Sequence, residues 1–440
     1  MRFRSSEVAS ATGGRLVGDD VELTGASFDS RSIGAGQLFV PIVAERDGHD
    51  FAGAAVSAGA AAYLTSRGIV AEGPAIEVAD TAAALMDLAA WGARRLGDPS
   101  GAGTMIVGVT GSVGKTSTKD LAASAIGAGR RTTANERSFN NEQGLPVTVL
   151  NAPDDTEVLI VEMGMRGFGE IARLCAIAPP TIGIVTAVAA AHTAMVGGLD
   201  GVARAKGELV EALPATGTAV LNADDAHVLA MAGRTDARVV TFGESPASDV
   251  RVVAVELDEL ARPTIRVVTP WGDGTARLAV SGRHMAGNAA AALAAAGSVG
   301  VDLATAISGL ERATLSPGRM TVHRLNSGGV LVNDAYNANP TSMRASLQSL
   351  VAIPAERRIA VLGVMAELDD PASGHAEIAG LATALGIELV PVGTDLYGRP
   401  PVDDPIEAVG PIGRGTAVVV KASLVGGLQA VAAELLARNR

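Results

Sequence analysis

The residues best suited to chemistry stand in a glycine-rich segment that ends in the triplet Gly114-Lys115-Thr116. In loops of this kind backbone N–H groups surround phosphate oxygens, the lysine reaches the terminal phosphates, and the hydroxyl after it can ligate Mg²⁺. The spacing differs from the strict G-x-x-x-x-G-K-T form, because Val109 stands where that form has its first glycine. A chance glycine turn could look similar, but the Gly-Lys-Thr core directly after an apolar run argues against it. The segment predicts a site for ATP phosphates and Mg²⁺ with these ligands: Gly111, Ser112, Gly114, Lys115, Thr116 and Ser117.

Four apolar runs must position this segment and other polar residues. They lie at residues 105–109, 158–161, 182–185 and 218–221, and helical patterns separate them. Strands that alternate with helices form a parallel sheet covered on both faces, with ligands at the carboxyl ends of the strands. Glu162 stands at such an end, and we expect it to bind Mg²⁺ rather than to face solvent. The predicted fold class is therefore α/β.

The length of the chain and two breaks in its pattern predict three domains. Single domains cluster at roughly 100–150 residues, so 440 residues exceed one hydrophobic core. Glycine, proline and serine in residues 97–103 suit a linker, and a second boundary falls near residues 314–317. Beyond it, strand-like runs at 359–362, 388–392 and 417–420 and helical patterns at 343–351 and 424–436 indicate a smaller α/β domain. We expect domains at residues 1–100, 101–314 and 315–440.

Charge and hydropathy exclude several classes of protein. The net charge of −12 and the isoelectric point near 5.1 oppose binding to nucleic acid, because a polyanion would be repelled. The most apolar run, residues 289–296, is far shorter than the roughly 20 residues that span a bilayer. The first residues lack the apolar core of a secretion signal, and the single cysteine, Cys175, cannot form an internal disulfide. We expect a soluble, cytoplasmic and monomeric protein in which Cys175 is a small buried thiol.

Several segments together resemble the Mur ligases, the ATP-dependent enzymes that form amide bonds in peptidoglycan synthesis. The resemblance spans almost the whole chain and is closest to the type that adds D-alanyl-D-alanine. The most type-specific string is Asn333-Asp334-Ala335-Tyr336-Asn337-Ala338-Asn339-Pro340. The other carriers are residues 29–31, 36–40, 47–51, 138–142, 162–164, 203–208, 221–225, 282–284 and 317–319, with His192 and Asn288.

This resemblance implies a fold, substrates and residue roles. The N-terminal α/β domain would bind the uridine nucleotide, the central domain would be a P-loop ATPase-like parallel sheet, and the C-terminal α/β domain would be Rossmann-like. ATP and Mg²⁺ would act on UDP-N-acetylmuramoyl-tripeptide and D-alanyl-D-alanine. Nucleotide contacts are implied for Asn288, Arg319 and Asp334, metal contacts for Thr116, Glu162, His192 and Lys206, and catalysis for Lys115, Lys206 and His192. Substrate contacts are implied for Ser30, Arg31, Asp47, His49, Ser138, Asn140, Asn141, Tyr336, Asn337 and Asn339.

Three of these residues keep an alternative role. His49 could equally be a surface or capping residue, and Arg319 could be an ordinary surface cation. Lys206 falls on the apolar face of a helical segment, residues 202–213, where a lysine must pair with an anion or lose its proton. The pairing partner would be a phosphate or Glu162. The resemblance implies instead a carbamate on the Lys206 amine that ligates a second Mg²⁺.

Some positions depart from the family pattern. Alanines at 187, 189 and 194 surround His192, Met285 follows His284 where asparagine is usual, and Val364 replaces an aspartate. Two sister ligases, the one that adds the third peptide residue and the folylpolyglutamate type, therefore remain alternatives, as does a non-catalytic nucleotide-binding regulator. The absence of an Asp-Asn-Pro-Arg motif opposes the first sister ligase, and retention of Lys115, Thr116, Glu162 and Lys206 opposes the regulator. The pattern leaves open whether the third peptide residue is diaminopimelate or lysine.

Overall fold

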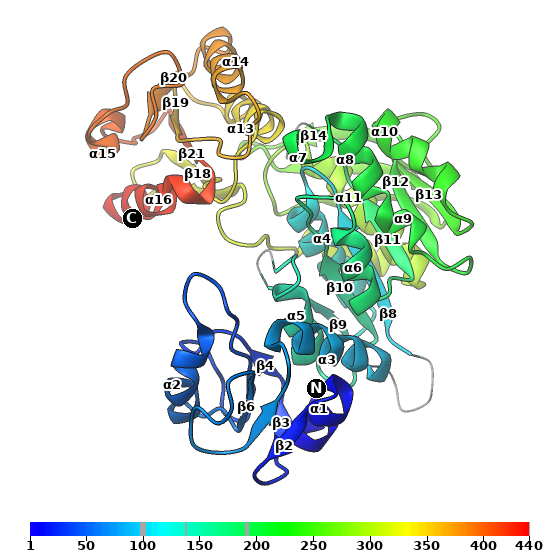
Figure 1. The fold of residues 1–440 in the computed structure, drawn as a ribbon. Coiled ribbons are helices and arrows are strands. Elements are labelled where there is room, and N and C mark those ends of the chain that lie inside the picture. Colours follow the sequence, from blue (N-terminus) through cyan, green and yellow to red (C-terminus); the bar gives the residue numbers. More distant parts are fainter. Residues whose placement is uncertain (97–102, 137–138, 190–192, 440) are drawn as a thin grey trace.

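The computed structural model describes residues 1–96, 103–136, 139–189 and 193–439, and its strands form three large sheets in succession along the chain (Figure 1). Figure 1 shows the first part of the chain in blue, the central part from cyan to yellow-green, and the last part from yellow to red. Within the described ranges, no helix has the length and apolar character needed to cross a bilayer.

The first sheet has five strands in the order β2-β7-β6-β5-β4, and a pair formed by β1 and β3 lies beside it. These strands are β1 (Arg2–Arg4), β2 (Arg15–Val17), β3 (Glu22–Thr24), β4 (Ala26–Ser27), β5 (Leu38–Phe39), β6 (Ala62–Thr65) and β7 (Ala75–Glu77). The helices are α1 (Ser5–Thr12), η1 (Gly48–Phe51), α2 (Ala52–Ser57) and α3 (Thr81–Arg95). Asp80 begins α3, because its carboxylate accepts hydrogen bonds from the N–H groups of Ala82 and Ala83.

The second sheet has nine strands in the order β16-β15-β14-β13-β12-β11-β8-β10-β9. Neighbours from β9 to β14 are parallel, whereas β15 and β16 extend the sheet in antiparallel fashion. The strands are β8 (Met105–Thr110), β9 (Thr132–Ala134), β10 (Val158–Glu162), β11 (Ile182–Val185), β12 (Thr218–Asn222), β13 (Arg238–Gly243), β14 (Val250–Leu257), β15 (Pro263–Thr269) and β16 (Gly272–Arg277). The helices are α4 (Lys115–Gly127), α5 (Gly144–Asn151), α6 (Glu170–Ile177), α7 (Thr193–Val196), α8 (Leu199–Lys206), α9 (Glu208–Glu211), α10 (Ala226–Leu229), η2 (Ala230–Arg234), α11 (Met285–Val299) and α12 (Leu303–Glu311).

The third sheet has five strands in the order β17-β18-β21-β19-β20, all parallel except β17. They are β17 (Thr321–Arg324), β18 (Val330–Asn333), β19 (Arg357–Leu362), β20 (Glu388–Pro391) and β21 (Thr416–Lys421). The helices are α13 (Pro340–Ala352), α14 (Pro371–Ala384), α15 (Pro405–Val409), η3 (Leu424–Gly426) and α16 (Leu428–Arg438). The family resemblance implied such an α/β architecture, and the strands expected near residues 359, 388 and 417 are confirmed.

Strands β8, β10, β11 and β12 of the central sheet are covered on both faces, which is why they are continuous apolar runs. On β8, Val107 and Val109 pack in the cluster that contains α4 and α11, whereas Ile106 belongs to the cluster on the other face. Gly108 lies between them, and a Cβ there would come within 2.8 Å of Cδ1 of Leu209 on α9. The alanines of α11 let it lie close against α4. This packing fixes the start of α4 relative to β8.

The apolar core continues from the central sheet into both neighbours. Helix α3 packs against α5, and one cluster joins Leu85 and Leu88 to Leu145 and Leu159. A second cluster extends from α4 and α11 through Met320 to the third sheet. The domain limits expected at residues 100 and 314 therefore stay predictions, because residues on either side of each limit share a core.

Candidate active site

The glycine-rich loop lies between β8 and α4, with its backbone fixed by close contacts. Gly111 has a φ of 151°, and a Cβ there would lie 1.9 Å from the hydroxyl oxygen of Thr186. Gly114 has a φ of 82° and leads into α4 at Lys115. A Cβ on Gly114 would lie 2.9 Å from Oδ1 of Asn288, so this asparagine stands directly beside the loop. The left-handed backbone at both positions requires glycine.

Lys115 is folded back onto the loop that precedes it. Its ammonium group donates a hydrogen bond to the carbonyl oxygen of Gly111 at 2.8 Å. Partial burial lowers the pKa of Lys115, and the nearby carboxylate of Glu162 opposes that shift. The amine of Lys115 thus lies at the start of α4, where the terminal phosphates of a nucleotide would meet the helix N-terminus.

Glu162 ends β10, which pairs in parallel with β8, so its carboxylate lies beside the loop. The carboxylate accepts hydrogen bonds from the Thr116 hydroxyl at 2.5 Å and from the Asn140 amide at 2.8 Å. Glu162 and Thr116 are almost fully buried. A carboxylate and a hydroxyl are hard oxygen donors of the kind Mg²⁺ prefers, so these residues fit the ion.

Further metal ligands would have to come largely from the phosphates and water. Among the residues that the structure describes, no three His, Cys, Asp or Glu side chains are grouped to hold a metal ion. Mg²⁺ commonly uses one or two carboxylates and completes its octahedron with phosphate oxygens and water. His192, expected at this site, lies outside the described residues.

Lys206 points into the core at the end of α8, as its helical period predicted. Only 3% of the residue is exposed, whereas Arg204 on the opposite face is exposed. Burial holds the pKa of Lys206 well below its ordinary value, the charge of Lys115 lowers it further, and Glu162 raises it. A lysine in this environment loses its proton more easily than a free lysine, which favours chemistry at the neutral amine.

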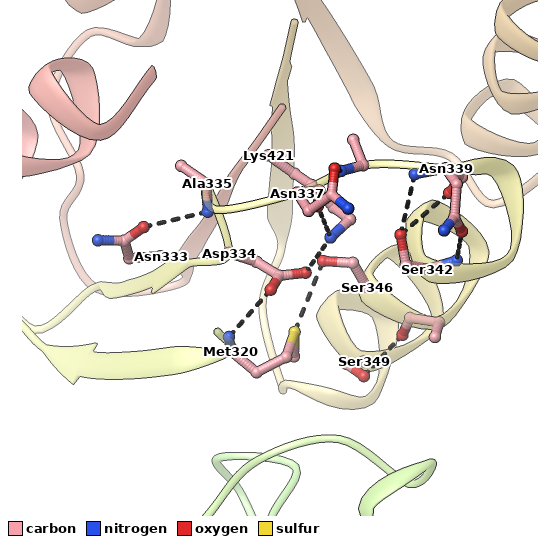
Figure 2. Close-up of polar contacts among 12 residues, drawn as sticks. Met320, Asn333, Asp334, Ala335, Asn337, Asn339, Ser342, Ser346, Ser349 and Lys421 are labelled. Carbon is pink, nitrogen blue, oxygen red and sulfur yellow. Dashed lines mark hydrogen bonds and ion pairs between the residues drawn. The ribbon is translucent and has the colours of Figure 1, made fainter. Parts of the chain in front are cut away.

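A second polar cluster comes from the C-terminal sheet (Figure 2). Lys421, at the end of β21, forms an ion pair of 2.6 Å with Asp334 and donates to the carbonyl oxygen of Asn337 at 2.9 Å (Figure 2). The other oxygen of Asp334 accepts the N–H of Met320 at 3.1 Å. Met320 has a φ of 49°, a conformation that costs a non-glycine residue roughly 1–2 kcal/mol, and this hydrogen bond helps to offset the cost.

Arg319 lies between Gly318 and Met320, both of which have left-handed backbone. Its guanidinium carbon is 4.3 Å from the centre of the Tyr336 ring. Such stacking holds the planar guanidinium in a fixed orientation. Arg319 is half-buried and lines the cavity described below, so it is not an ordinary surface cation.

These clusters meet in one cavity of about 630 Å³ between the second and third sheets. A cavity of this size is typical for a small-molecule site. The expected site residues that line it are Gly111, Ser112, Gly114, Lys115, Thr116, Ser117, Asn140, Asn141, Glu162, Lys206, Asn288, Arg319, Asp334, Tyr336, Asn337 and Asn339. Parts of the chain more than 200 residues apart thus contribute to a single site, as the resemblance implied.

The expected residues of the first sheet lie away from this cavity. Arg31 is exposed and forms an ion pair with Asp29, whose pKa it lowers to about 2. His49 is buried: its Nδ1 lies 2.6 Å from the Asp47 carboxylate, and its Nε2 accepts the N–H of Ser66 at 3.1 Å. Because His49 is buried, it is not a surface residue, and the side chain that caps η1 is that of Asp47. Ser30 is half-buried, and Ser138 lies outside the described residues.

Two expected substrate contacts also shape the local backbone. Asn141 accepts the N–H of Gly144 at 2.9 Å at the start of α5. Asn339 accepts the N–H of Ser342 at 2.9 Å and begins α13 (Figure 2). The side-chain oxygen of each asparagine therefore accepts a hydrogen bond at a helix start, while both residues also line the cavity. Helix starts need such acceptors, which explains asparagine at these points.

Sequence reasoning missed Lys421 and Glu367, which also line the cavity. Lys421 follows an apolar strand in the same way that Glu162 does, so the rule applied to the central sheet could have found it. Glu367 follows β19 after a short loop, and its charge acts on Lys115 across the cavity. No local spacing marks it.

The arrangement as a whole suits phosphate transfer. The helix N-terminus, the basic side chains of Lys115 and Arg319, and the oxygen atoms of Thr116 and Glu162 surround a space that two parts of the chain line. Preorganised donors of this kind stabilise the negative charge that moves when a terminal phosphate is transferred.

Comparisons with known proteins agree with this geometry. Residues 109–296 match the family model of the Mur ligase middle domain, and residues 318–430 match the model described as Mur ligase, glutamate ligase domain. The UDP-N-acetylmuramoyl-tripeptide–D-alanyl-D-alanine ligase of Mycobacterium tuberculosis is 42% identical over 83% of this chain and 77% of its own length.

Solved structures show the same likeness. The structure of MurF from Acinetobacter baumannii has a TM-score of 0.87 and 27% identity, and the match covers 99% of both chains. MurF from Thermotoga maritima in complex with ADP has a TM-score of 0.81 and 26% identity over 94% of this chain and 97% of that one. Residues, fold and site together lead to one conclusion: the chain belongs to the Mur ligase family.

Proposed function

We propose that this protein is an ATP-dependent, ADP-forming ligase that joins D-alanyl-D-alanine to UDP-N-acetylmuramoyl-tripeptide. The observation that carries the proposal is the cavity in which the phosphate-binding loop meets the segment Asp334 to Asn339. That segment carries the most type-specific part of the family resemblance. A relative with 42% identity bears the name of this activity. The protein would act as a monomer in the cytoplasm, where nucleotide-linked precursors of peptidoglycan are made.

The chemistry starts from a carboxylate, which is a poor electrophile at neutral pH. One carboxylate oxygen of the tripeptide attacks the γ-phosphorus of ATP, so that ADP leaves and an acyl phosphate forms. The amine of D-alanyl-D-alanine then attacks the acyl carbon, loses a proton, and expels inorganic phosphate as the amide forms. Each step brings negative oxygens together, and the site must neutralise them.

The residues of the cavity divide this work. Loop N–H groups and Lys115 hold the terminal phosphates, and Arg319 and Asp334 hold the nucleotide from the opposite side. Thr116 and Glu162 would hold Mg²⁺, with His192 as a further contact, and the ion would neutralise charge on the transferring phosphoryl group. Asn288 stands beside the loop on the nucleotide side. Ser138, Asn140, Asn141, Tyr336, Asn337 and Asn339 would face the peptide substrates, while Ser30, Arg31, Asp47 and His49 would serve the uridine portion.

Lys206 has two roles within this proposal. As a cation it would pair with a phosphate or with Glu162. As a neutral amine it would take up carbon dioxide, lose a proton and become an anionic carbamate with oxygen ligands for a metal. Its buried position and lowered pKa support the second role.

Phosphate release from purified protein tests the function directly. With ATP and Mg²⁺, phosphate should appear only when both the UDP-linked tripeptide and D-alanyl-D-alanine are present. Matched reactions supply the UDP-linked dipeptide with diaminopimelate or lysine, or a folate with glutamate. Turnover only in a matched reaction would assign the chain to a sister ligase, and nucleotide binding with no turnover in any reaction would support the regulator instead.

A further inference from the structure

Helix α4 carries a buried lysine that the proposed chemistry does not use. Lys119 lies one turn after Lys115 and is only 2% exposed. Its ammonium donates to the carbonyl oxygen of Asn135 at 2.6 Å and forms an ion pair of 2.9 Å with its neighbour Asp120. A charge placed in the core is costly unless its partners are fixed, so this group is expected to hold something in place.

On one side, the contacts of Lys119 lead to the metal-binding carboxylate. Asn135 follows β9, is 2% exposed, and accepts the backbone N–H of Glu162 through its side-chain oxygen at 2.9 Å. The carboxylate of that same residue accepts the hydroxyl of Thr116. Lys119, Asn135 and Glu162 thus form a continuous polar chain beneath the phosphate-binding loop.

On the other side, Asp120 holds the segment that leads into the third sheet. Its carboxylate accepts the N–H of Ser316 at 2.7 Å and lies 3.2 Å from the Ser316 hydroxyl oxygen. These two residues are 196 positions apart in the sequence. Ser316 stands three residues before Arg319, in the stretch between α12 and β17.

We propose that Lys119 and Asp120 are positioning residues that couple the orientation of Glu162 to the placement of Arg319. The two side chains hold each other in place, because the residues are adjacent on α4 and form an ion pair. Through Asn135, Lys119 holds the backbone at Glu162 in place. Asp120 holds the segment around Ser316, between α12 and β17, against the same helix, α4. The N-terminus of α4 is where the phosphates would bind. Glu162 on one side of the cavity and the segment before Arg319 on the other are therefore both held by α4. Only the effect of this coupling on catalysis rests on the proposed function, because the contacts themselves exist without substrate.

Binding of a non-hydrolysable ATP analogue to the full chain tests the coupling without any peptide substrate. Lys119→Met should raise the Mg²⁺ concentration needed for half-maximal analogue binding about ten-fold, as expected when a residue behind a metal ligand is lost. Asp120→Ala should weaken analogue binding about five-fold at saturating Mg²⁺, a size typical of coupling between positioned sites. Ser316→Ala, which keeps its N–H, should give a smaller loss in the same direction.

Asp404→Ala is the matched control, because the Asp404 carboxylate also accepts two hydrogen bonds, here both from backbone N–H groups, but the residue begins α15, away from the cavity. It should lower Tm and leave analogue binding and its Mg²⁺ dependence unchanged. If the Lys119 and Asp120 variants behave like this control, with a lower Tm and unchanged analogue binding, the coupling is refuted and the pair is merely structural. Should Asp120→Ala not fold, Asp120→Asn and Ser316→Ala provide the same comparison.

The binding experiment and the activity assay distinguish a failure of the coupling from a failure of the proposed function. Wild-type protein that binds the analogue but releases no phosphate with D-alanyl-D-alanine would overturn the proposed function and leave the coupling intact. For an active wild type, the Asp120→Ala loss should appear as a raised KM for ATP, with the KM for the UDP-linked tripeptide unchanged. An equal loss for Asp404→Ala would overturn the coupling.

Discussion

Lys115 and Lys206 lie near one carboxylate, Glu162, and burial lowers the pKa of both amines. The charge of Lys115 lowers the pKa of Lys206 further, so a proton on one amine disfavours a proton on the other. The phosphates of a nucleotide would add negative charge beside both amines. The two lysines nevertheless differ, because Lys115 is half-buried in the cavity whereas Lys206 is enclosed.

Replacement of Lys115 by alanine is expected to abolish turnover and leave folding intact. The terminal phosphates lose a point charge at the moment of transfer, and phosphate release should fall to less than about a tenth of wild type, a difference above ~1.4 kcal/mol. Arg94→Ala, which removes an exposed cation of α3, is the control and should keep full activity. Residual activity above that tenth would show that the loop has been wrongly assigned.

Variants of Lys206 separate its two roles. Lys206→Ala should lose most activity and regain part of it when a short carboxylic acid fills the cavity and replaces the carbamate oxygens. Lys206→Arg keeps the positive charge but forms no such carbamate, so it should be inactive. Both are measured by phosphate release at constant bicarbonate. A fully active arginine variant would rule out the carbamate and favour the ion pair.

At the scale of elements, the sequence predicted the buried parallel strands well and the edge strands poorly. β8, β10, β11 and β12 are covered on both faces, and burial on both faces requires the continuous apolar runs that were recognised. β15 alternates between buried and more exposed residues, and β16 is mostly exposed, so neither strand contains such a run. They were therefore absent from the prediction, together with β13 and β14.

The same distinction holds for the site. Residues that follow a parallel strand, such as Glu162, could be placed from the strand alone. The ion pair between Asp334 and Lys421 could not, because it joins residues 87 positions apart through the pairing of β18 with β21. The contacts of His49 with Asp47 and Ser66 likewise need the segment around residue 47 to lie beside the segment after β6, which the sequence does not show.

The loop after β19 provides a pH-dependent test at this scale. The buried His375 on α14 accepts the N–H of Met365 through Nε2 at 3.0 Å, and its Nδ1 lies 2.6 Å from the carbonyl oxygen of Pro371. This arrangement needs neutral imidazole, and burial lowers the pKa of His375. Below the unfolded pKa of roughly 6.5 the unfolded chain takes up a proton that the folded chain resists, so stability falls as pH drops.

Urea unfolding at pH 7.5 and 5.5 measures this effect. The free energy of unfolding of wild type, taken relative to His375→Gln, should be smaller at pH 5.5, by at most about 1.4 kcal/mol per pH unit. Glutamine offers a donor and an acceptor but does not titrate in this range. A difference that is the same at both pH values would contradict a neutral, buried histidine.

At the scale of the whole molecule, the site depends on how the third sheet lies against the second. Loop residues contribute from one side of the cavity and Arg319, Asp334 and Lys421 from the other. The apolar cluster that passes through Met320 connects the two sides. A change in their relative position would alter every phosphate contact together.

Substrate is therefore expected to draw the parts of the chain together and to exclude water from the acyl phosphate. Small-angle scattering should show a smaller radius of gyration when a non-hydrolysable ATP analogue and the UDP-linked tripeptide are both present. D-alanyl-D-alanine alone should leave the radius unchanged. An identical radius with and without the analogue and tripeptide would mean that the site is complete without closure.

The tight fit of Gly111 bears on how this enzyme could be inhibited. A compound that hydrogen-bonds to the backbone N–H groups of residues 111–114 would contact atoms that no substitution other than proline removes. Gly111 itself has no room for a Cβ beside Thr186 and has a φ that side chains rarely adopt. A mutation there that displaced the compound would also distort the phosphate-binding loop. Cells exposed to such a compound would have to acquire resistance elsewhere, through export of the drug or overproduction of the enzyme.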